Sequence, residues 1–98
     1  MTIHETRNGD ILTVCPEGRL DTNSAPELDR FLQKNYPSIS GLVLDCSKLD
    51  YISSAGLRVL VIAKKALKDK GSVRILNASP LIMGVFKVTG MVDLFEFE

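Results

Sequence analysis

The sequence predicts one α/β domain over residues 1–98, with helices packed against a mixed sheet of four or five strands. Apolar runs typical of strands alternate with segments whose apolar residues repeat at helical spacing, in the order β-β-α-β-α-β-α with a short tail. Strands separated by helices are joined by crossovers and become parallel, whereas an opening hairpin adds an antiparallel member. With 45% hydrophobic residues, the chain can bury one core.

The first two strands are expected over residues 2–7 and 10–15. Between them lies Asn8-Gly9, the strongest short signal for a β-hairpin, because both residue types tolerate positive φ. Residues 16–18, Pro-Glu-Gly, are expected to end the second strand.

A helix is expected next, over about residues 22–35. Polar capping residues precede Pro26, which suits a first helical turn, and Tyr36-Pro37 stops the helix. The apolar residues at helical spacing are Leu28, Phe31 and Leu32.

The middle of the chain predicts a strand and then a longer helix. Residues 42–44, Leu-Val-Leu, indicate a central strand covered on both faces. A helix follows from about Ala55 to Lys70, with Gly71 expected at its C′ position. The buried stripe of this helix is expected to hold Leu57, Leu60, Val61 and Leu67.

The C-terminal part predicts one more strand and helix. Val73 and Ile75 alternate with polar residues in a strand. Ser79 followed by Pro80 predicts the start of a short helix that ends near Val88 and is closed by Gly90. A final short strand or tail is expected to contain Leu94, Phe95 and Phe97.

Charge and composition exclude several classes of protein. Twelve basic residues balance twelve acidic ones, which argues against nucleic-acid binding. The start is polar, and the longest apolar run, residues 59–63, is far shorter than the roughly 20 residues of a membrane span, so we expect a soluble protein without direct membrane contact. Cys15 and Cys46 lack metal-ligand or redox spacing, which indicates buried, reduced thiols of a cytoplasmic protein and no metal site.

The stretch from Asp50 to Leu57 carries the main functional signal. It places Ser53, Ser54 and Gly56 where a strand-like region gives way to the long amphipathic helix. We expect Ser54 to be the helix N-cap, because serine accepts hydrogen bonds from the free N–H groups there. The same position favours an anion, so Ser54 is a structural cap, a phosphate carrier, or both.

The sequence resembles the STAS domain, the fold of bacterial anti-sigma-factor antagonists, over nearly its whole length. Residues 18–22, Gly-Arg-Leu-Asp-Thr, resemble the family's turn before the first helix, and residues 49–57 resemble its signature loop. Ser79-Pro80, residues 85–91 and Leu94-Phe95 resemble its C-terminal helix and tail. In the best-known family pattern an Asp precedes the phosphorylated serine and a hydroxyl residue follows it; here these positions hold Ser53 and Ala55.

This resemblance implies a phosphorylation-controlled regulator of transcription in the stress response. A partner kinase that is also the anti-sigma factor would phosphorylate Ser54, with Ser53 as the alternative site. Unphosphorylated, the chain would bind that anti-sigma factor; phosphorylated, it would release it, and a serine phosphatase would reset it. ATP belongs to the kinase, so no cofactor is expected for this chain. The expected partner-binding residues are Asp21, Thr22, Asn23, Ser53, Ser54, Ala55, Gly56 and Arg58.

Three of these residues also have purely structural interpretations. Asp21 can cap the first helix, Gly56 can allow close packing early in the second helix, and Arg58 can belong to a solvated face. Arg58 stands out among the basic residues of its helix because it lies one turn from Ser54.

Two other functions are compatible with the sequence. The same fold serves as a small soluble subunit of membrane transport complexes, where it would bind an ABC-type ATPase. A serine hydrolase is a weaker alternative, because the chain has a single histidine, His4, and no G-x-S-x-G elbow around Ser54. We therefore expect a binding protein and not an enzyme.

Overall fold

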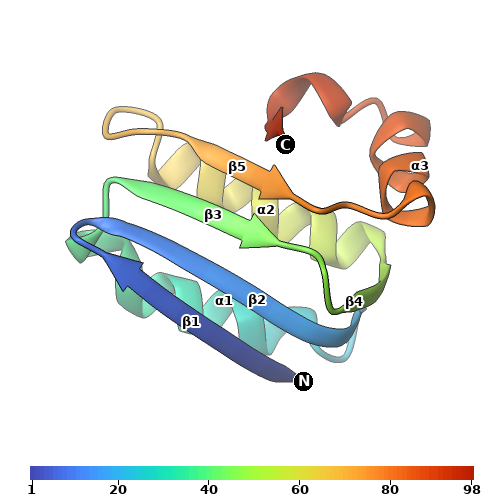
Figure 1. Cartoon of the computed structure of the whole chain (residues 1–98), viewed down its shortest axis with the longest axis horizontal. Helices are drawn as coiled ribbons and strands as arrows, with labels where there is room; N and C mark the ends of the chain where they lie inside the picture. The colour runs from blue at the N-terminus through green and yellow to red at the C-terminus, as the bar shows by residue number, and fades with distance from the viewer.

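Six strands and three α-helices make up the computed structural model, which describes residues 1–98 (Figure 1). The elements follow in the order β1 Thr2–Asn8, β2 Ile11–Leu20, α1 Ala25–Asn35, η1 Tyr36–Ser38, β3 Gly41–Asp45, β4 Leu49–Ile52, α2 Ser54–Ala66, β5 Val73–Leu76, α3 Pro80–Val88, η2 Val92–Leu94 and β6 Glu96–Phe97. The two η elements are single 3₁₀ turns.

The sheet is mixed, as the sequence predicts. Its strand order is β1-β2-β3-β5-β6, and β4 pairs with β2 beside this path. Only β1 and β2 are antiparallel; every other pair is parallel. The predicted number of four or five strands is too low, because residues 49–52, which resemble part of a loop in sequence, form β4.

Strand β2 runs through Pro16, so the expected end of this strand at residues 16–18 is wrong. The first part of β2 pairs with β3 through Val14, and its last part pairs with β4 from Gly18 onward. Pro16 lies between these two parallel ladders, where its missing N–H interrupts neither of them. Gly18, with φ of +103°, stands where the register of the second ladder shifts. β2 thereby reaches the start of α2.

The predicted opening hairpin is confirmed, although its turn lies one residue further on. Asn8 still pairs with Ile11, so Gly9 and Asp10 form the turn. Gly9 has φ of +64°, a value that glycine adopts at no steric cost.

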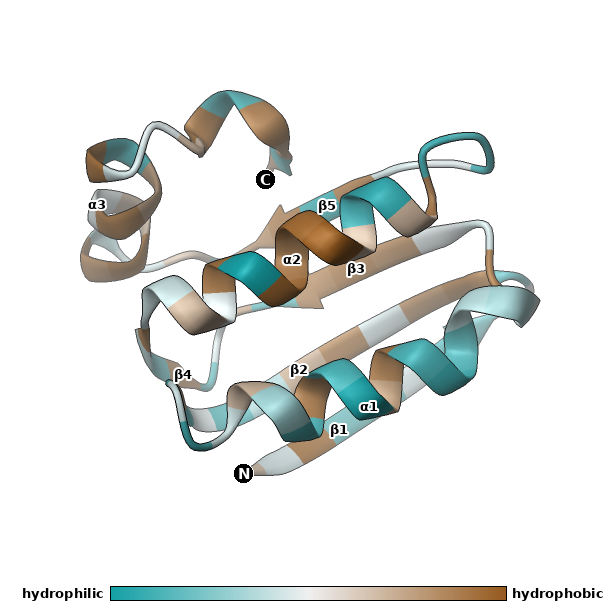
Figure 2. Cartoon of the chain, turned by 180° about the vertical axis from the view of Figure 1, so that it is seen from behind, coloured by the Kyte–Doolittle hydropathy of each residue, from teal (hydrophilic) through white to brown (hydrophobic).

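Helices α1 and α2 run side by side over the same face of the sheet (Figures 1 and 2). Leu42 and Leu44 of β3 are buried in the core beneath them. Val43 points to the opposite face, which these helices do not cover, and is still only 7% exposed. Its neighbours in register are Thr13 and Arg74, whose side chains flank it on that face. The central strand is buried as predicted, but its second face is shielded by neighbouring strands and not by a helix layer.

Two helix ends differ from the sequence expectation. α1 begins at Ala25, not near residue 22, and α2 ends at Ala66 with Leu67 as its C-cap. Gly71 is therefore not the C′ residue of α2. A Cβ at Gly71 would fall on the backbone carbonyl of Ser40, so glycine is needed there for a close approach of two backbones.

The C-terminal helix is as predicted. Ser79 caps α3 by accepting a hydrogen bond from the Ile82 N–H at 3.2 Å, and Gly90, with φ of +74°, follows its end. The ring of Phe86 packs edge-to-face against Phe95 and Phe97, with centroid separations of 5.8 and 5.1 Å. These contacts attach η2 and β6 to α3.

No helix of the chain combines the length and the apolar character that crossing a bilayer requires.

Candidate functional site

The β4–α2 junction and the β2–α1 turn meet at one edge of the molecule. The Ser53 N–H donates to the Leu20 carbonyl at 2.9 Å, which ties the start of α2 to the end of β2. Arg19 adds a second connection, because its guanidinium carbon lies 4.3 Å from the centre of the Tyr51 ring. Two segments about thirty residues apart in sequence thus form one surface.

Ser53, and not Ser54, is the N-cap of α2. Ser53 has an extended backbone, with φ of −101° and ψ of 176°, and its hydroxyl accepts from the Gly56 N–H at 3.5 Å. Ser54 is the first residue of the helix, and its side chain is exposed. The expectation that Ser54 caps the helix was wrong by one position, because only the backbone conformation distinguishes two adjacent serines. The Ser54 hydroxyl makes no hydrogen bond within the chain and faces solvent.

Asp21 organises the turn before α1. Its Oδ1 accepts hydrogen bonds from the N–H groups of Asn23 at 3.0 Å and Ser24 at 3.2 Å. These bonds, above all the one from Ser24, hold the pKa of Asp21 below its ordinary value. The Arg19 guanidinium, 3.6 Å from Oδ2, lowers that pKa further. Asp21 therefore organises the turn that leads into α1 and does not cap the helix itself, whose N-cap position is held by Ser24.

Ser24 supports this turn with its side chain rather than capping the helix. Its hydroxyl donates to the Arg19 carbonyl at 2.6 Å and accepts from the Asp21 N–H at 2.9 Å. The turn is held from both sides, which leaves Thr22 and Asn23 exposed at its tip.

Gly56 is buried, and its packing explains the choice of glycine. A Cβ at this position would lie 2.8 Å from Leu20 Cγ, 2.9 Å from Ile52 Cγ1 and 3.0 Å from the Leu20 carbonyl oxygen. Close packing, one of the two interpretations from the sequence, therefore holds. Because Gly56 is buried, it shapes the expected partner surface from beneath.

We expect Gly56→Ala to lower the free energy of unfolding by about 1–2 kcal/mol. Overpacking at such a contact costs about 1–3 kcal/mol, and the better helix propensity of alanine returns up to about 1 kcal/mol. Chemical denaturation measures the difference. The matched control is Gly84→Ala in α3, where an added Cβ meets no atom within 4 Å. That variant should be as stable as the parent or more so, and equal stability of Gly56→Ala and the parent would contradict the packing argument.

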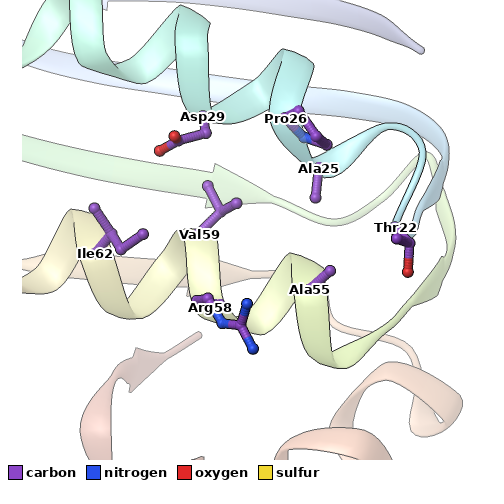
Figure 3. Close-up of a pocket in the computed structure, with 8 residues that line it drawn as sticks. All are labelled: Thr22, Ala25, Pro26, Asp29, Ala55, Arg58, Val59 and Ile62. Carbon is purple, nitrogen blue, oxygen red and sulfur yellow. The ribbon is translucent and has the colours of Figure 1, made fainter.

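A groove of about 320 Å³ lies between α1 and α2 next to this junction (Figure 3). Three residues predicted from sequence, Thr22, Ala55 and Arg58, are among its lining residues. The remaining lining residues, none of which was predicted to belong to a site, are Ala25, Pro26, Asp29, Val59 and Ile62.

The sequence carried a signal for this groove. On each side the lining residues keep the spacing i, i+3, i+4, i+7, from Thr22 to Asp29 and from Ala55 to Ile62. Spacing defines one face of each helix, but it does not reveal that the two faces lie opposite one another. Arg58 contributes the only positive charge of the groove and Asp29 the only negative one.

Other chemistry-bearing residues lie apart from this surface. Burial raises the pKa of the Cys46 thiol to about 12, and both cysteines are unbridged. His4 Nε2 hydrogen bonds Glu17 at 2.8 Å on the β1–β2 hairpin. No three His, Cys, Asp or Glu side chains gather in a way that could hold a metal ion.

Comparisons with a family model and with related proteins all point to one family. The family model described as STAS domain matches residues 3–98. BtrV of Bordetella bronchiseptica, provisionally named an anti-sigma factor antagonist, is 32% identical over 87 residues, covering 87% of this chain and 75% of that protein. The anti-sigma-B factor antagonist of Listeria monocytogenes is 30% identical over 95 residues, covering 94% and 82%.

Solved structures agree on the fold. The anti-sigma factor antagonist SpoIIAA in its unphosphorylated form has a TM-score of 0.87 at 15% identity, and the match covers 99% of this chain and 88% of that one. The Bacillus SpoIIAA in the phosphorylated form has a TM-score of 0.78 at 15% identity, covering 99% and 91%. The predicted α/β architecture and the resemblance drawn from the motifs are both confirmed.

Proposed function

This chain belongs to the STAS domain family, and on that premise we propose that it is an anti-sigma factor antagonist controlled by phosphorylation of Ser54. Unphosphorylated, it binds an anti-sigma factor in the cytoplasm and so frees a sigma factor for transcription. Phosphorylated, it releases that partner. The names of its relatives in Bordetella and Listeria support the antagonist role.

The observation that carries the proposal is the difference between two adjacent hydroxyls. Ser53 is half-buried and its oxygen is occupied as the helix cap, whereas Ser54 is exposed and its oxygen is unoccupied. A kinase needs an accessible hydroxyl, so we assign modification to Ser54. A phosphate there lies at the positive end of the α2 dipole, which favours it by about 0.3–1 kcal/mol, so it need not unfold the helix.

The proposed surface joins the β2–α1 turn to the first turn of α2. Thr22, Asn23, Ser54 and Arg58 offer exposed side chains to a partner, and Asp21, Ser53 and Ala55 are half-buried beside them. A phosphate adds a charge of about −1.5 to −2 to this surface without any refolding. Binding is therefore the property that the modification changes.

The phosphoryl transfer itself belongs to the partner. The γ-phosphoryl group of ATP forms a bond to Ser54 Oγ as its bond to ADP breaks, and the hydroxyl proton passes to a base of the kinase. A separate serine phosphatase transfers the phosphoryl group to water and restores the hydroxyl. This chain contributes the acceptor oxygen and the surface that places it.

Phosphosite mapping tests the proposal. The unmodified chain is used to isolate its anti-sigma factor from the native cell, and the two are incubated with ATP before mass spectrometry. We expect one phosphate, on Ser54, which disappears in Ser54→Ala and persists in Ser53→Ala. Phosphate on Ser53 would contradict the site assignment. Recovery of a membrane transport complex in place of an anti-sigma factor would contradict the function.

A further inference from the structure

Arg58 is the unpaired cation of the proposed partner surface. The other arginine there, Arg19, is engaged by Asp21 and by the Tyr51 ring. Arg58 is exposed and takes part in none of the ion pairs or side-chain hydrogen bonds of the chain. Its side chain extends along α2 toward the end of the helix where Ala55 lies (Figure 3). The first turn of α2 contains no acidic residue that would bind it.

Ser54 and Arg58 are four residues apart on the same helix. Residues at i and i+4 lie on one face, with Cβ atoms about 5–6 Å apart, and helical side chains lean toward the N-terminus. The Arg58 guanidinium is therefore within reach of a group attached to Ser54 Oγ. Ser53 lies outside the helical backbone, and its hydroxyl is directed to the Gly56 N–H, so its oxygen is already engaged as the cap.

We propose that Arg58 binds the phosphate on Ser54, and that phosphorylation thereby withdraws the only cation of the groove from the partner. The inference rests on the proposed function and names how its switch works. A guanidinium donates two parallel hydrogen bonds to phosphate oxygens, which makes this pair stronger than an ordinary surface ion pair.

The consequence concerns the whole groove. Before modification, Arg58 is available to a carboxylate of the anti-sigma factor, and Asp29 balances its charge across the groove. After modification the cation is occupied within the chain, and Asp29 and the remaining phosphate charge leave the groove negative. Release then has two causes, namely the lost cation and the added anion, and both arise from one residue.

Phosphorus NMR tests the pair without the kinase. Phosphoserine is installed at position 54 during translation, and its second ionisation is followed by titration in the parent and in Arg58→Gln. The ordinary pKa is about 6, and Arg58 should lower it by at least about 0.3 unit relative to Arg58→Gln. The matched control is Lys65→Gln, because Lys65 is an exposed cation of α2 about 16 Å along the helix from Ser54, which is beyond the screening length. It should titrate like the parent, and equal pKa values in the parent and Arg58→Gln would overturn the inference.

Binding to the isolated anti-sigma factor tests the consequence. Arg58→Gln should weaken binding of the unmodified chain about three- to tenfold, yet change binding of the phosphorylated chain little, because there the cation is already withdrawn. Equal effects on both forms would overturn the withdrawal of Arg58. A failure to phosphorylate Ser54 in the mapping experiment would contradict the proposed function, whereas the phosphorus titration still decides whether the pair forms.

Discussion

Replacing Ser54 with Asp should weaken binding of the anti-sigma factor by about ten- to a hundredfold. A like-charge pair about 5 Å apart costs about 3 kcal/mol at an effective dielectric near 20, and salt screening lowers that figure at an exposed position. Each 1.4 kcal/mol corresponds to a tenfold change in affinity. Isothermal titration calorimetry against the isolated partner measures the loss. The phosphate itself, with its larger charge, should have a larger effect.

Ser54→Asn is the matched control, because it has nearly the shape of Asp without the charge. It should bind the partner within about threefold of the parent's affinity, since a substitution at an exposed position usually changes a free energy by no more than about 0.5 kcal/mol. The difference between Asp and Asn should shrink as salt is raised. Ser54→Asp should not lose stability, because an acid in the first turn of α2 is favoured by the helix dipole. Equal affinity of Ser54→Asp and Ser54→Asn would contradict a switch based on charge.

Phe86→Ala should lower the free energy of unfolding by about 3–5 kcal/mol, the usual cost of removing a buried phenylalanine side chain. Phe86 is 0% exposed and forms edge-to-face contacts with Phe95 and Phe97. Its loss removes the contact that holds the C-terminal segment against α3, and α3 in turn packs against β4, the strand that leads into the Ser54 junction. Urea denaturation measures the change.

Val88→Ala is the control for this prediction on the same helix. Val88 is 87% exposed, so its truncation should change stability by no more than about 0.5 kcal/mol. A parallel proteolysis experiment should show earlier cleavage after residue 88 in Phe86→Ala than in Val88→Ala. If Phe86→Ala were as stable as Val88→Ala, the aromatic cluster would not hold the C-terminal segment.

Strong local signals explain which parts of the fold could be predicted. Asn8-Gly9 between two strand-like runs predicted the hairpin, and Ser79-Pro80 with Gly90 predicted both ends of α3. β4 could not be predicted in this way. It contains only four residues, of which only Leu49 and Ile52 are buried, and it becomes a strand by pairing with the far end of β2. That pairing also lets β2 continue past Pro16, where local preference predicts an end.

The amino-acid sequence by itself determined the α/β class, the family motifs and the presence of two adjacent serines at the start of α2. Only the tertiary structure decided which of two adjacent serines is free. Ser53 hydrogen bonds to the end of β2 through its N–H, and its extended backbone makes it the cap, so the free hydroxyl belongs to Ser54. The groove between α1 and α2 likewise depends on how two helices lie on one sheet. Local preferences act over a few residues, whereas these features depend on contacts between segments far apart in the chain.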